Sequence, residues 1–311
     1  MLTIFTVPKP FIGHIGVIQR NAISSWLRLH PDAEIFVFGD EAGTAEATME
    51  LRVRHIPEIA KNEHGTPLVN DLFTKAQQLA RHDLICFVNC DIILTSDFLR
   101  AAQHVMRSRE RFLLVGECWN LDVENALCFD APRWETELQS RIAREAKRRG
   151  HWAIDYFAFP RGLYRDMPPF AVGRAGFDNW LIWKARDLGG AVIDATAVTK
   201  VVHQNHNYAH IAGGQQTAYH GAEAQTNLEL AGGRKHFYSI GEATYYLTPR
   251  AIRPSITGLL CFAHIWNEHL ERPLHRLNWQ VLELTRPLRH GLGLHIVNYR
   301  KIKSWLGGRL G

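Results

Sequence analysis

One apolar run in the first third of the chain constrains fold and function more than any other segment. Residues 84–94 are apolar apart from Asn89 and Asp91, a pattern typical of a strand buried on both faces of a sheet. A carboxylate in such surroundings loses several kcal/mol of hydration unless a positive group lies beside it. Open α/β sheets bind ligands at the carboxyl ends of their strands, so we expect that group to be a metal ion. The alternative is that Asp91 only caps a turn.

Short apolar runs alternate with segments of helical periodicity up to about residue 200. This alternation predicts an α/β domain whose mostly parallel sheet is covered by helices on both faces. Residues 117–152 are expected to form a helical insertion whose basic stripe is a solvated face. We predict strands at residues 2–7, 34–38, 51–56, 84–88, 112–116, 154–159 and 191–193, and helices at residues 15–29, 68–80, 96–106 and 178–188.

The pattern changes near residue 250, and so does the charge. The chain carries a net charge of +5, of which residues 250–311 contribute +7 and residues 1–249 contribute −2. We therefore predict one α/β domain over residues 1–249 and a basic, helical extension over residues 250–311. A nearly neutral body argues against a nucleic-acid-binding domain. Mixed basic and apolar residues in 265–311 indicate an amphipathic helix on an anionic membrane surface, or a helix packed on the parent domain or on a second copy.

The cysteines and the first residues indicate the compartment. The five cysteines are odd in number and show neither a Cys-x-x-Cys pair nor zinc-ligand spacing, which favours reduced thiols. The amino-terminal residues do not resemble a signal peptide, and the apolar stretch at residues 256–266 is too short to span a bilayer. We expect a cytoplasmic protein, peripheral at the inner face of a membrane if the extension binds lipid.

Three common fingerprints are missing from the sequence. There is no Gly-x-Gly-x-x-Gly after the first strand, no Gly-x4-Gly-Lys-Ser/Thr and no Gly-x-Ser-x-Gly. Dinucleotide oxidoreductases, P-loop phosphotransferases and α/β-hydrolases are thereby disfavoured. The polar clusters that could carry chemistry lie at residues 89–91, 155–178 and 203–210.

The order of these features resembles a GT-A fold glycosyltransferase over roughly residues 1–210. An apolar strand enters Asn89-Cys90-Asp91, a later helix opens with Gly-Phe-Asp-Asn-Trp-Leu around Asp178, and a further strand leads to His203. The resemblance implies that Asp91 binds a divalent cation on the diphosphate of a nucleotide sugar and that His203 completes the metal site. Asn89 replaces the first Asp of the family's Asp-x-Asp motif, which keeps an oxygen for the ribose or the metal but loses a charge.

The chemistry of sugar transfer calls for such a cation. Breaking the bond between an anomeric carbon and a nucleoside diphosphate releases negative charge, which a metal ion stabilises as a Lewis acid. Oxygen ligands suit Mg or Mn, and an imidazole shifts the preference towards Mn. His203 lies nearest the strand end and is the preferred ligand, with His206 as the alternative. The plain interpretation of residues 203–210 is a polar surface loop.

The remaining site residues are assigned from the same resemblance. Asp178 is the candidate catalytic base, because a carboxylate there could take the proton of an acceptor hydroxyl; its alternative role is a helix N-cap. Further candidates divide by ligand. Asp155 and Trp180 are assigned to the acceptor, Thr6 and Asp40 to the nucleotide, and Lys75 and Arg174 to phosphate unless they are only solvated cations.

We thus expect a metal-dependent, hexosyltransferase-like glycosyltransferase with a glycan, lipid-linked or small-molecule acceptor. Two alternatives remain: a metal-dependent hydrolase built on Asp91, Asp178 and His203, and a non-catalytic protein that binds a membrane surface through its extension. A nucleotidyltransferase is disfavoured, because the loop after the first strand lacks the glycine-rich sequence with Arg that such enzymes carry.

Overall fold

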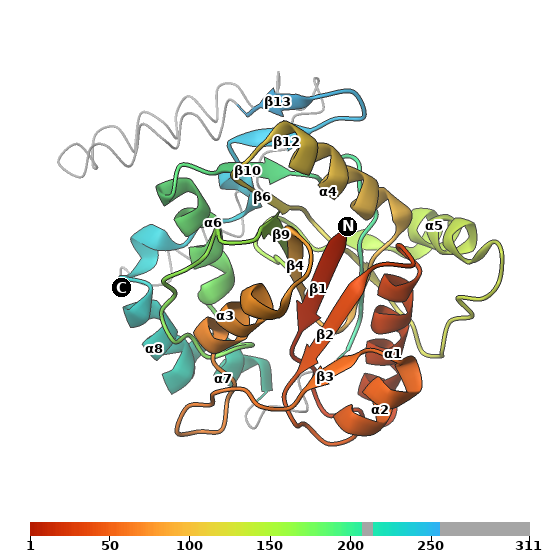
Figure 1. Ribbon diagram of the computed structural model, residues 1–311, viewed down its shortest axis with the longest axis horizontal. Coiled ribbons are helices and arrows are strands. Elements are labelled where there is room, and N and C mark those ends of the chain that lie inside the picture. The colour runs from red at the N-terminus through yellow and green to blue at the C-terminus, as the bar shows by residue number, and fades with distance from the viewer. Residues whose placement is uncertain (207–213, 256–311) are drawn as a thin grey trace, which may run out of the picture.

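The computed structural model describes residues 1–206 and 214–255, which form a large mostly parallel sheet with helices on both faces (Figure 1). The nine strands follow the order β13-β12-β10-β6-β9-β4-β1-β2-β3. The predicted α/β class is confirmed. The strands of this sheet are β1 (Leu2–Thr6), β2 (Glu34–Phe38), β3 (Arg54–Ile56), β4 (Leu84–Val88), β6 (Phe112–Val115), β9 (Tyr156–Pro160), β10 (Ala191–Asp194), β12 (Tyr245–Leu247) and β13 (Ile252–Pro254).

Strand direction decides where the polar residues gather. β1 pairs in parallel with both β2 and β4, and β2 pairs in parallel with β3. β9 runs antiparallel between β4 and β6, and β13 runs antiparallel to β12. The carboxyl ends of β1, β2, β3 and β4 therefore meet at one edge of the sheet. Loops that leave this edge carry the predicted nucleotide and metal residues.

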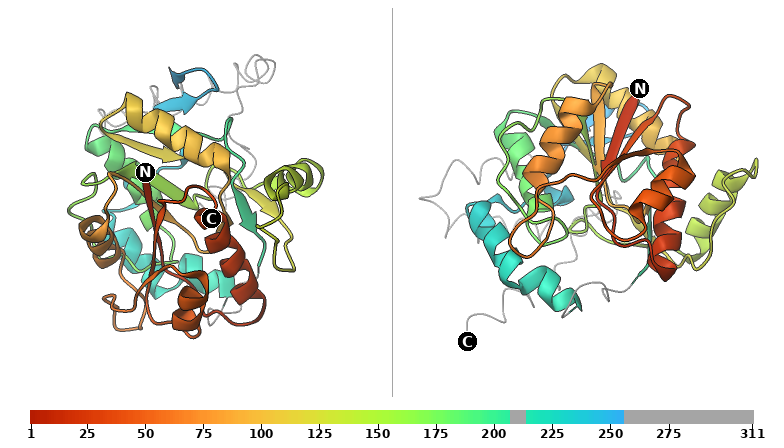
Figure 2. Two further views of the ribbon diagram at one scale, coloured as in Figure 1. Left: turned by 45° about the vertical axis from the view of Figure 1, so that its right-hand side comes forward. Right: turned by 60° about the horizontal axis from the view of Figure 1, so that its bottom comes forward.

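Side chains alternate between the two faces of the sheet, and each face has its own core. Ile4 packs with Trp26 under α1 (Gly13–Leu27), α2 (Thr44–Leu51) and α4 (Ser96–Ser108). Phe5 points the other way and meets Phe73 edge-on at 5.0 Å, under α3 (Val69–Leu79) and α6 (Phe177–Asp187). Figure 2 shows helices on both sides of the sheet. Each fully buried Phe contributes about 2 kcal/mol through removal from water.

A second, smaller sheet brings two distant segments together. Its order is β5 (Ile92–Ile93), β11 (Val202–Gln204), β7 (Trp119–Leu121) and β8 (Lys147–Arg148). β11 pairs antiparallel with β5, so that His203 lies opposite Ile92. The helix α5 (Trp134–Glu145) covers this sheet through Leu138 and Ile142. The sheet therefore fixes His203 next to the residue that follows Asp91.

Two predicted elements differ from the structure. Residues 51–56 are not one strand, because α2 continues to Leu51 and β3 begins only at Arg54. Arg52, between them, is in the left-handed conformation and ends the helix. The insertion at residues 117–152 is helical only over α5. β7 and β8 were missed because strands this short depend on their partners: β7 pairs with β8 on one side and, on the other, with β11, which lies far along the chain.

The carboxyl-terminal part adds two short helices and a strand pair to the domain. α7 (Gly214–His220) and α8 (Ala222–Leu230) are followed by the 3-10 turns η1 (Arg234–His236) and η2 (Ile240–Glu242). The predicted extension begins within the β12–β13 pair, and its residues 256–311 lie outside the described part of the chain. Within residues 1–206 and 214–255, no helix combines the length and apolar character needed to cross a membrane.

Candidate metal and donor site

Asp91 lies in the loop that follows β4, buried to 6 % exposure. Its Oδ2 atom lies 2.9 Å from Lys9 Nζ and 2.9 Å from His206 Nε2. An ammonium group and an imidazole thus face the same carboxylate oxygen. A buried carboxylate needs this compensation because its hydration has been removed.

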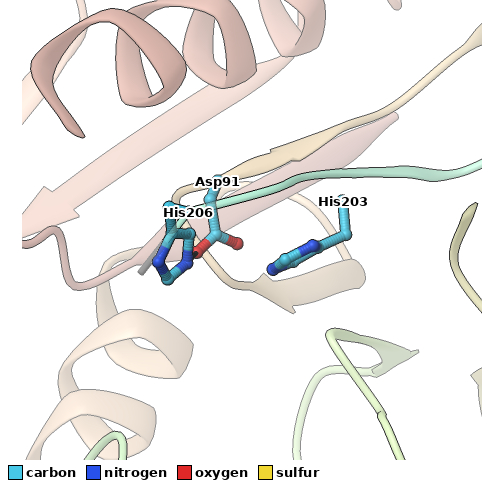
Figure 3. Close-up of side chains that lie close together, drawn as sticks. All are labelled: Asp91, His203 and His206. Atoms are coloured by element: carbon cyan, nitrogen blue, oxygen red, sulfur yellow. Dashed lines mark hydrogen bonds and ion pairs between the residues drawn. The ribbon is translucent and has the colours of Figure 1, made fainter. Parts of the chain in front are cut away.

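The imidazoles of His203 and His206 lie on either side of the Asp91 carboxylate (Figure 3). Their ring centroids are 5.4 Å apart. One ligand atom from each of the three residues lies within 4.8 Å of the other two. The structure thus brings both histidines to Asp91. His210, in the same predicted cluster, lies outside the described residues.

The three side chains fit a divalent ion. Asp91 Oδ1 and His203 Nδ1 are buried, and within residues 1–206 and 214–255 neither has a hydrogen-bond partner. Buried polar atoms left unpaired cost about 1–3 kcal/mol each, so an additional ligand is the expected partner. One carboxylate and two imidazoles form a donor set suited to Mn and, less strongly, to Mg.

The protonation of the cluster also suits a metal. Burial by itself raises the pKa of Asp91, but Lys9 and the hydrogen bond from His206 outweigh it and hold this pKa well below its usual range. Burial lowers the pKa of His203, against the opposing effect of the Asp91 and Asp155 charges. At neutral pH the carboxylate is therefore ionised and His203 is neutral, as metal ligands must be.

Lys9 is the charged contact of this cluster that sequence reasoning missed. It lies in the loop after β1, between Pro8 and Pro10. Its backbone N–H donates to Gln19 Oε1 at 2.6 Å, and Gln19 Nε2 donates back to the Lys9 carbonyl at 2.8 Å. Gln19, on α1, is 1 % exposed. The signal in the sequence was a single lysine between two prolines directly after the first strand.

The buried side-chain amides of Gln204 and Asn21 hold the backbone that carries the Asp91 cluster. Gln204 Nε2 donates to the backbone carbonyls of Ile18 at 2.7 Å and of Asp91 at 3.1 Å. Asn21 Nδ2 donates to Gln204 Oε1 at 3.0 Å. These bonds tie α1, β11 and the Asp91 loop together. The backbone under the candidate ligands is therefore rigidly held.

Asn89, which follows β4, is hydrogen-bonded to Asp155 through both its side chain and its backbone. Its side-chain amide donates to Asp155 Oδ1 at 3.1 Å, and its backbone N–H donates to the Asp155 carbonyl at 2.9 Å. Asp155 Oδ2 in turn lies 3.1 Å from Arg149 Nε. Arg149 belongs to the basic stripe that the sequence assigned to a solvated face, and its side chain is only 17 % exposed. The expectation of a solvated cation is wrong for this residue.

Asp178 is the second residue of α6, after Gly176 and Phe177. The N-cap is Gly176, whose φ of 115° favours glycine and whose extra Cβ would meet the Phe237 ring at 2.7 Å. The carboxylate Oδ1 of Asp178 accepts from the Gly176 N–H at 3.2 Å and the Asn179 N–H at 2.9 Å. Burial, helped by the Asp155 charge, raises the pKa of Asp178 to about 6. The alternative prediction, that Asp178 is the N-cap of this helix, is wrong, because Gly176 holds that position.

Trp180 and Thr6 are core residues. Trp180 is 4 % exposed, and its ring packs against those of Phe170 at 5.2 Å and Trp183 at 6.0 Å. An acceptor contact through this ring is not offered by the structure, because the other core rings cover it. Thr6 ends β1 with a fully buried side chain. A contact between the Thr6 hydroxyl and a nucleotide stays a prediction.

Asp40 lines a hollow of about 550 Å³ at the carboxyl edge of the sheet. Residues 57–61, after β3, and Asp71 and Lys75 of α3 form the other walls. Lys61 Nζ lies 2.5 Å from Asp40 Oδ1 and lowers the pKa of that carboxyl. Lys75 pairs with Asp71 at 2.9 Å and also donates to the Glu58 carbonyl. Lys75 is thus held in the wall of this hollow.

Arg174 is part of a different contact. Its guanidinium pairs with Glu223 at 2.8 Å, and the same carboxylate accepts from Asn62. These bonds join the loop before α6 to α8 and to the loop after β3. The predicted role of Arg174 at phosphate is therefore not supported, because its guanidinium is already paired and its side chain is 15 % exposed.

No protein-family model matches the sequence, and a search of curated proteins finds no match. Solved structures with a similar backbone arrangement include glucosyl-3-phosphoglycerate synthase from Mycobacterium tuberculosis. In complex with Mn²⁺, UDP and phosphoglyceric acid it is 14 % identical, with 75 % of this chain and 79 % of that chain covered and a TM-score of 0.45. The structure of the same enzyme with Mg²⁺ and UDP is 13 % identical, with 83 % of this chain and 92 % of that chain covered and a TM-score of 0.46.

A third similar structure is Staphylococcus aureus TarS, residues 1–349. It is 12 % identical, with 59 % of this chain and 54 % of that chain covered and a TM-score of 0.39. At identities of 12–14 % and TM-scores of 0.39–0.46, these likenesses concern the fold alone.

Proposed function

We propose that this chain is a metal-dependent glycosyltransferase of the GT-A type, which moves a sugar from a nucleoside diphosphate donor to an acceptor hydroxyl. The observation that carries the proposal is the buried group of Asp91, His203 and His206, whose ligand atoms lie within 4.8 Å of one another. The cluster lies at the carboxyl edge of a mostly parallel sheet, where ligands of such sheets bind. A base candidate with a raised pKa, Asp178, belongs to the same electrostatic environment through Asp155.

Asp91, His203 and His206 would hold Mn²⁺ or Mg²⁺. When bound, the ion supplies Lewis-acid stabilisation of the negative charge on the leaving diphosphate. The chain's own contribution is to hold an ionised carboxylate and a neutral imidazole ready in a buried site. The buried bonds of Gln204 keep the Asp91 backbone in position.

The nucleoside of the donor would occupy the hollow beside Asp40. The hollow and Asp91 are both formed by loops that leave the same edge of the sheet. The Asp40 carboxylate and the Lys61 ammonium offer an acceptor and a donor for a base or a ribose. A diphosphate attached to that nucleoside would then lie towards Asp91.

Asp178 would act as the base that takes the proton of the acceptor hydroxyl. With a pKa of about 6 it is mostly ionised at pH 7, and it is a stronger base than an ordinary carboxylate. The proton would pass from the acceptor oxygen to the carboxylate as that oxygen attacks the anomeric carbon. Asp155 is held by Arg149 and Asn89, so it suits binding of acceptor hydroxyls better than proton transfer.

The finer expectations from the sequence are part of this proposal. A hexose is the proposed sugar, and a glycan, a lipid-linked sugar or a small molecule the proposed acceptor. A cytoplasmic location rests on the cysteine pattern, and membrane contact through residues 265–311 rests on the basic and apolar composition of that segment. We also propose the domain boundary at residues 249/250 and self-association through the extension, both from the change of pattern and charge near residue 250.

Thermal-shift screening with UDP-, GDP- and dTDP-sugars, each with and without Mn²⁺, tests the function. A ligand that binds only the folded protein raises the melting temperature. We expect one nucleotide sugar to raise it only together with Mn²⁺, and Asp91→Asn to abolish the rise. Stabilisation by Mn²⁺ alone, with no response to any nucleotide, would favour the hydrolase instead.

A further inference from the structure

Lys9 contacts two of the three candidate metal ligands. Its Nζ lies 2.9 Å from Asp91 Oδ2 and 2.9 Å from His206 Nε2, two of the candidate ligand atoms. Its side chain is 26 % exposed, whereas those of Asp91 and His206 are 8 % and 6 % exposed. The ammonium therefore covers the cluster from its more open side.

The backbone of Lys9 is anchored independently of its side chain. Gln19 holds both the N–H and the carbonyl of Lys9. The loop lies close against α1 at Gly16, where a Cβ would meet the Phe11 carbonyl carbon and oxygen at 2.8 Å. Four rotatable bonds separate this anchored backbone from the charge. The ammonium can therefore change partners without any movement of the loop.

The ammonium and a divalent ion compete for the same atoms. If His206 Nε2 accepts from Lys9, its lone pair is used; if it is protonated and donates to Asp91, it has no lone pair. In both states His206 is blocked as a ligand. A divalent ion beside Asp91 would in addition repel the ammonium at close range.

We propose that Lys9 is an exchangeable counter-cation: it neutralises Asp91 while no divalent ion is bound, and it moves to the donor's diphosphate when ion and donor enter. The inference rests on the proposed function. Asp91 carries one negative charge, and a divalent ion and Lys9 together carry three positive charges. The net charge of plus two matches the two negative charges of a nucleotide sugar's diphosphate.

The exchange makes ion and donor binding cooperative. An ion that binds alone must displace Lys9 and leaves its ammonium without a partner. A donor supplies that partner, so each ligand strengthens the binding of the other by the same factor. Replacing Lys9 by an uncharged residue should remove both the competitor and the diphosphate contact.

Calorimetric titration of Lys9→Met tests the inference, with Mn²⁺ alone and with UDP, GDP and dTDP in the presence of Mn²⁺. We expect the variant to bind Mn²⁺ alone about tenfold more tightly than the wild type, and the nucleoside diphosphate about tenfold more weakly. Lys9→Arg should keep the diphosphate affinity. Lys184→Met is the matched control, because Lys184 pairs with Asp187 on the surface of α6, and it should change neither affinity.

Melting temperatures keep the test decisive if Lys9→Met is unstable. Without Lys9 the buried Asp91 has lost its main cation, so the variant should melt lower than the wild type and recover more on addition of Mn²⁺. A loss of both affinities, or no change in either, would show a merely structural role and overturn the inference while leaving the proposed function intact. A wild-type protein that binds no nucleotide with Mn²⁺ would overturn both.

Discussion

His203 lies opposite Ile92 in the antiparallel pair of β11 and β5, and Gln204 N donates to the Asp91 carbonyl at 3.2 Å. This register brings an imidazole to a carboxylate more than one hundred residues earlier in the sequence. The site therefore depends on the small sheet as much as on the large one.

Asp91→Asn should abolish metal-dependent activity. The amide has no negative charge to hold a divalent ion, and the loss of several kcal/mol of charge stabilisation corresponds to a decrease of about 100-fold or more in turnover. The measurement is turnover with Mn²⁺, together with the Mn²⁺-induced rise in melting temperature. A variant that keeps the wild-type response to Mn²⁺ would contradict the assignment.

His203→Gln and His206→Gln should each weaken Mn²⁺ binding. Both imidazoles lie within ligand distance of Asp91, so each contributes and neither is sufficient. We expect about tenfold losses in affinity, measured by titration in the presence of nucleotide. His220→Gln is a suitable control, since His220 ends α7 with an exposed side chain. If only one of the two substitutions changes the affinity, the other histidine is not a ligand.

The pH profile of turnover should show an acidic limb that belongs to Asp178. The base works only when ionised, and its pKa is raised to about 6. Activity should therefore fall about tenfold for each pH unit below that value. Asp178→Asn should lose most activity at every pH, and what remains should lack this limb. A wild-type limb near pH 4 would contradict the assignment of Asp178 as base.

The Asp178 carboxyl should make the folded state less stable as the pH rises, whereas an ion-paired Asp makes it more stable. Its folded-state pKa of about 6 lies above the ordinary value of 3.8, so the folded state binds a proton more tightly than the unfolded one. The stabilisation is complete below pH 3.8 and is lost as the pH rises through about 6. Urea unfolding of Asp178→Asn should therefore show a stability relative to wild type that increases from pH 4 to pH 7. A stability difference between variant and wild type that does not change with pH would contradict the raised pKa of Asp178.

Arg149→Met should destabilise the protein through Asp155. The pair is largely buried, with side chains 17 % and 7 % exposed, and its removal leaves Asp155 without its cation. We expect a loss of about 3 kcal/mol in the free energy of unfolding. The control is Asp83→Asn, which breaks the exposed pair with Arg161 and should cost less than about 1 kcal/mol. Equal effects in urea unfolding would contradict the role of burial.

The local sequence was sufficient for the fully apolar strands of the large sheet, but it misplaced the start of β3 and did not predict β12 or β13. Strands buried on both faces read as continuous apolar runs, so β2 and β4 were predicted with their observed bounds. Asp91 was found for the same reason, because a carboxylate inside such a run requires a partner. Short strands such as β7 and β8 carry no such signal, since they depend on pairing with each other and, for β7, with the distant β11.

The sequence by itself determined the fold class, the edge of the sheet that carries the polar loops and the carboxylate at its centre, because these follow from local apolar patterns. Only the tertiary structure decided that Lys9 faces Asp91, that Gln19 holds Lys9, and that Trp180 belongs to the core. Lys9 and Asp91 are 82 residues apart, and their contact depends on the pairing of β1 with β4. Long-range contacts of this kind arise from packing, for which no local pattern exists.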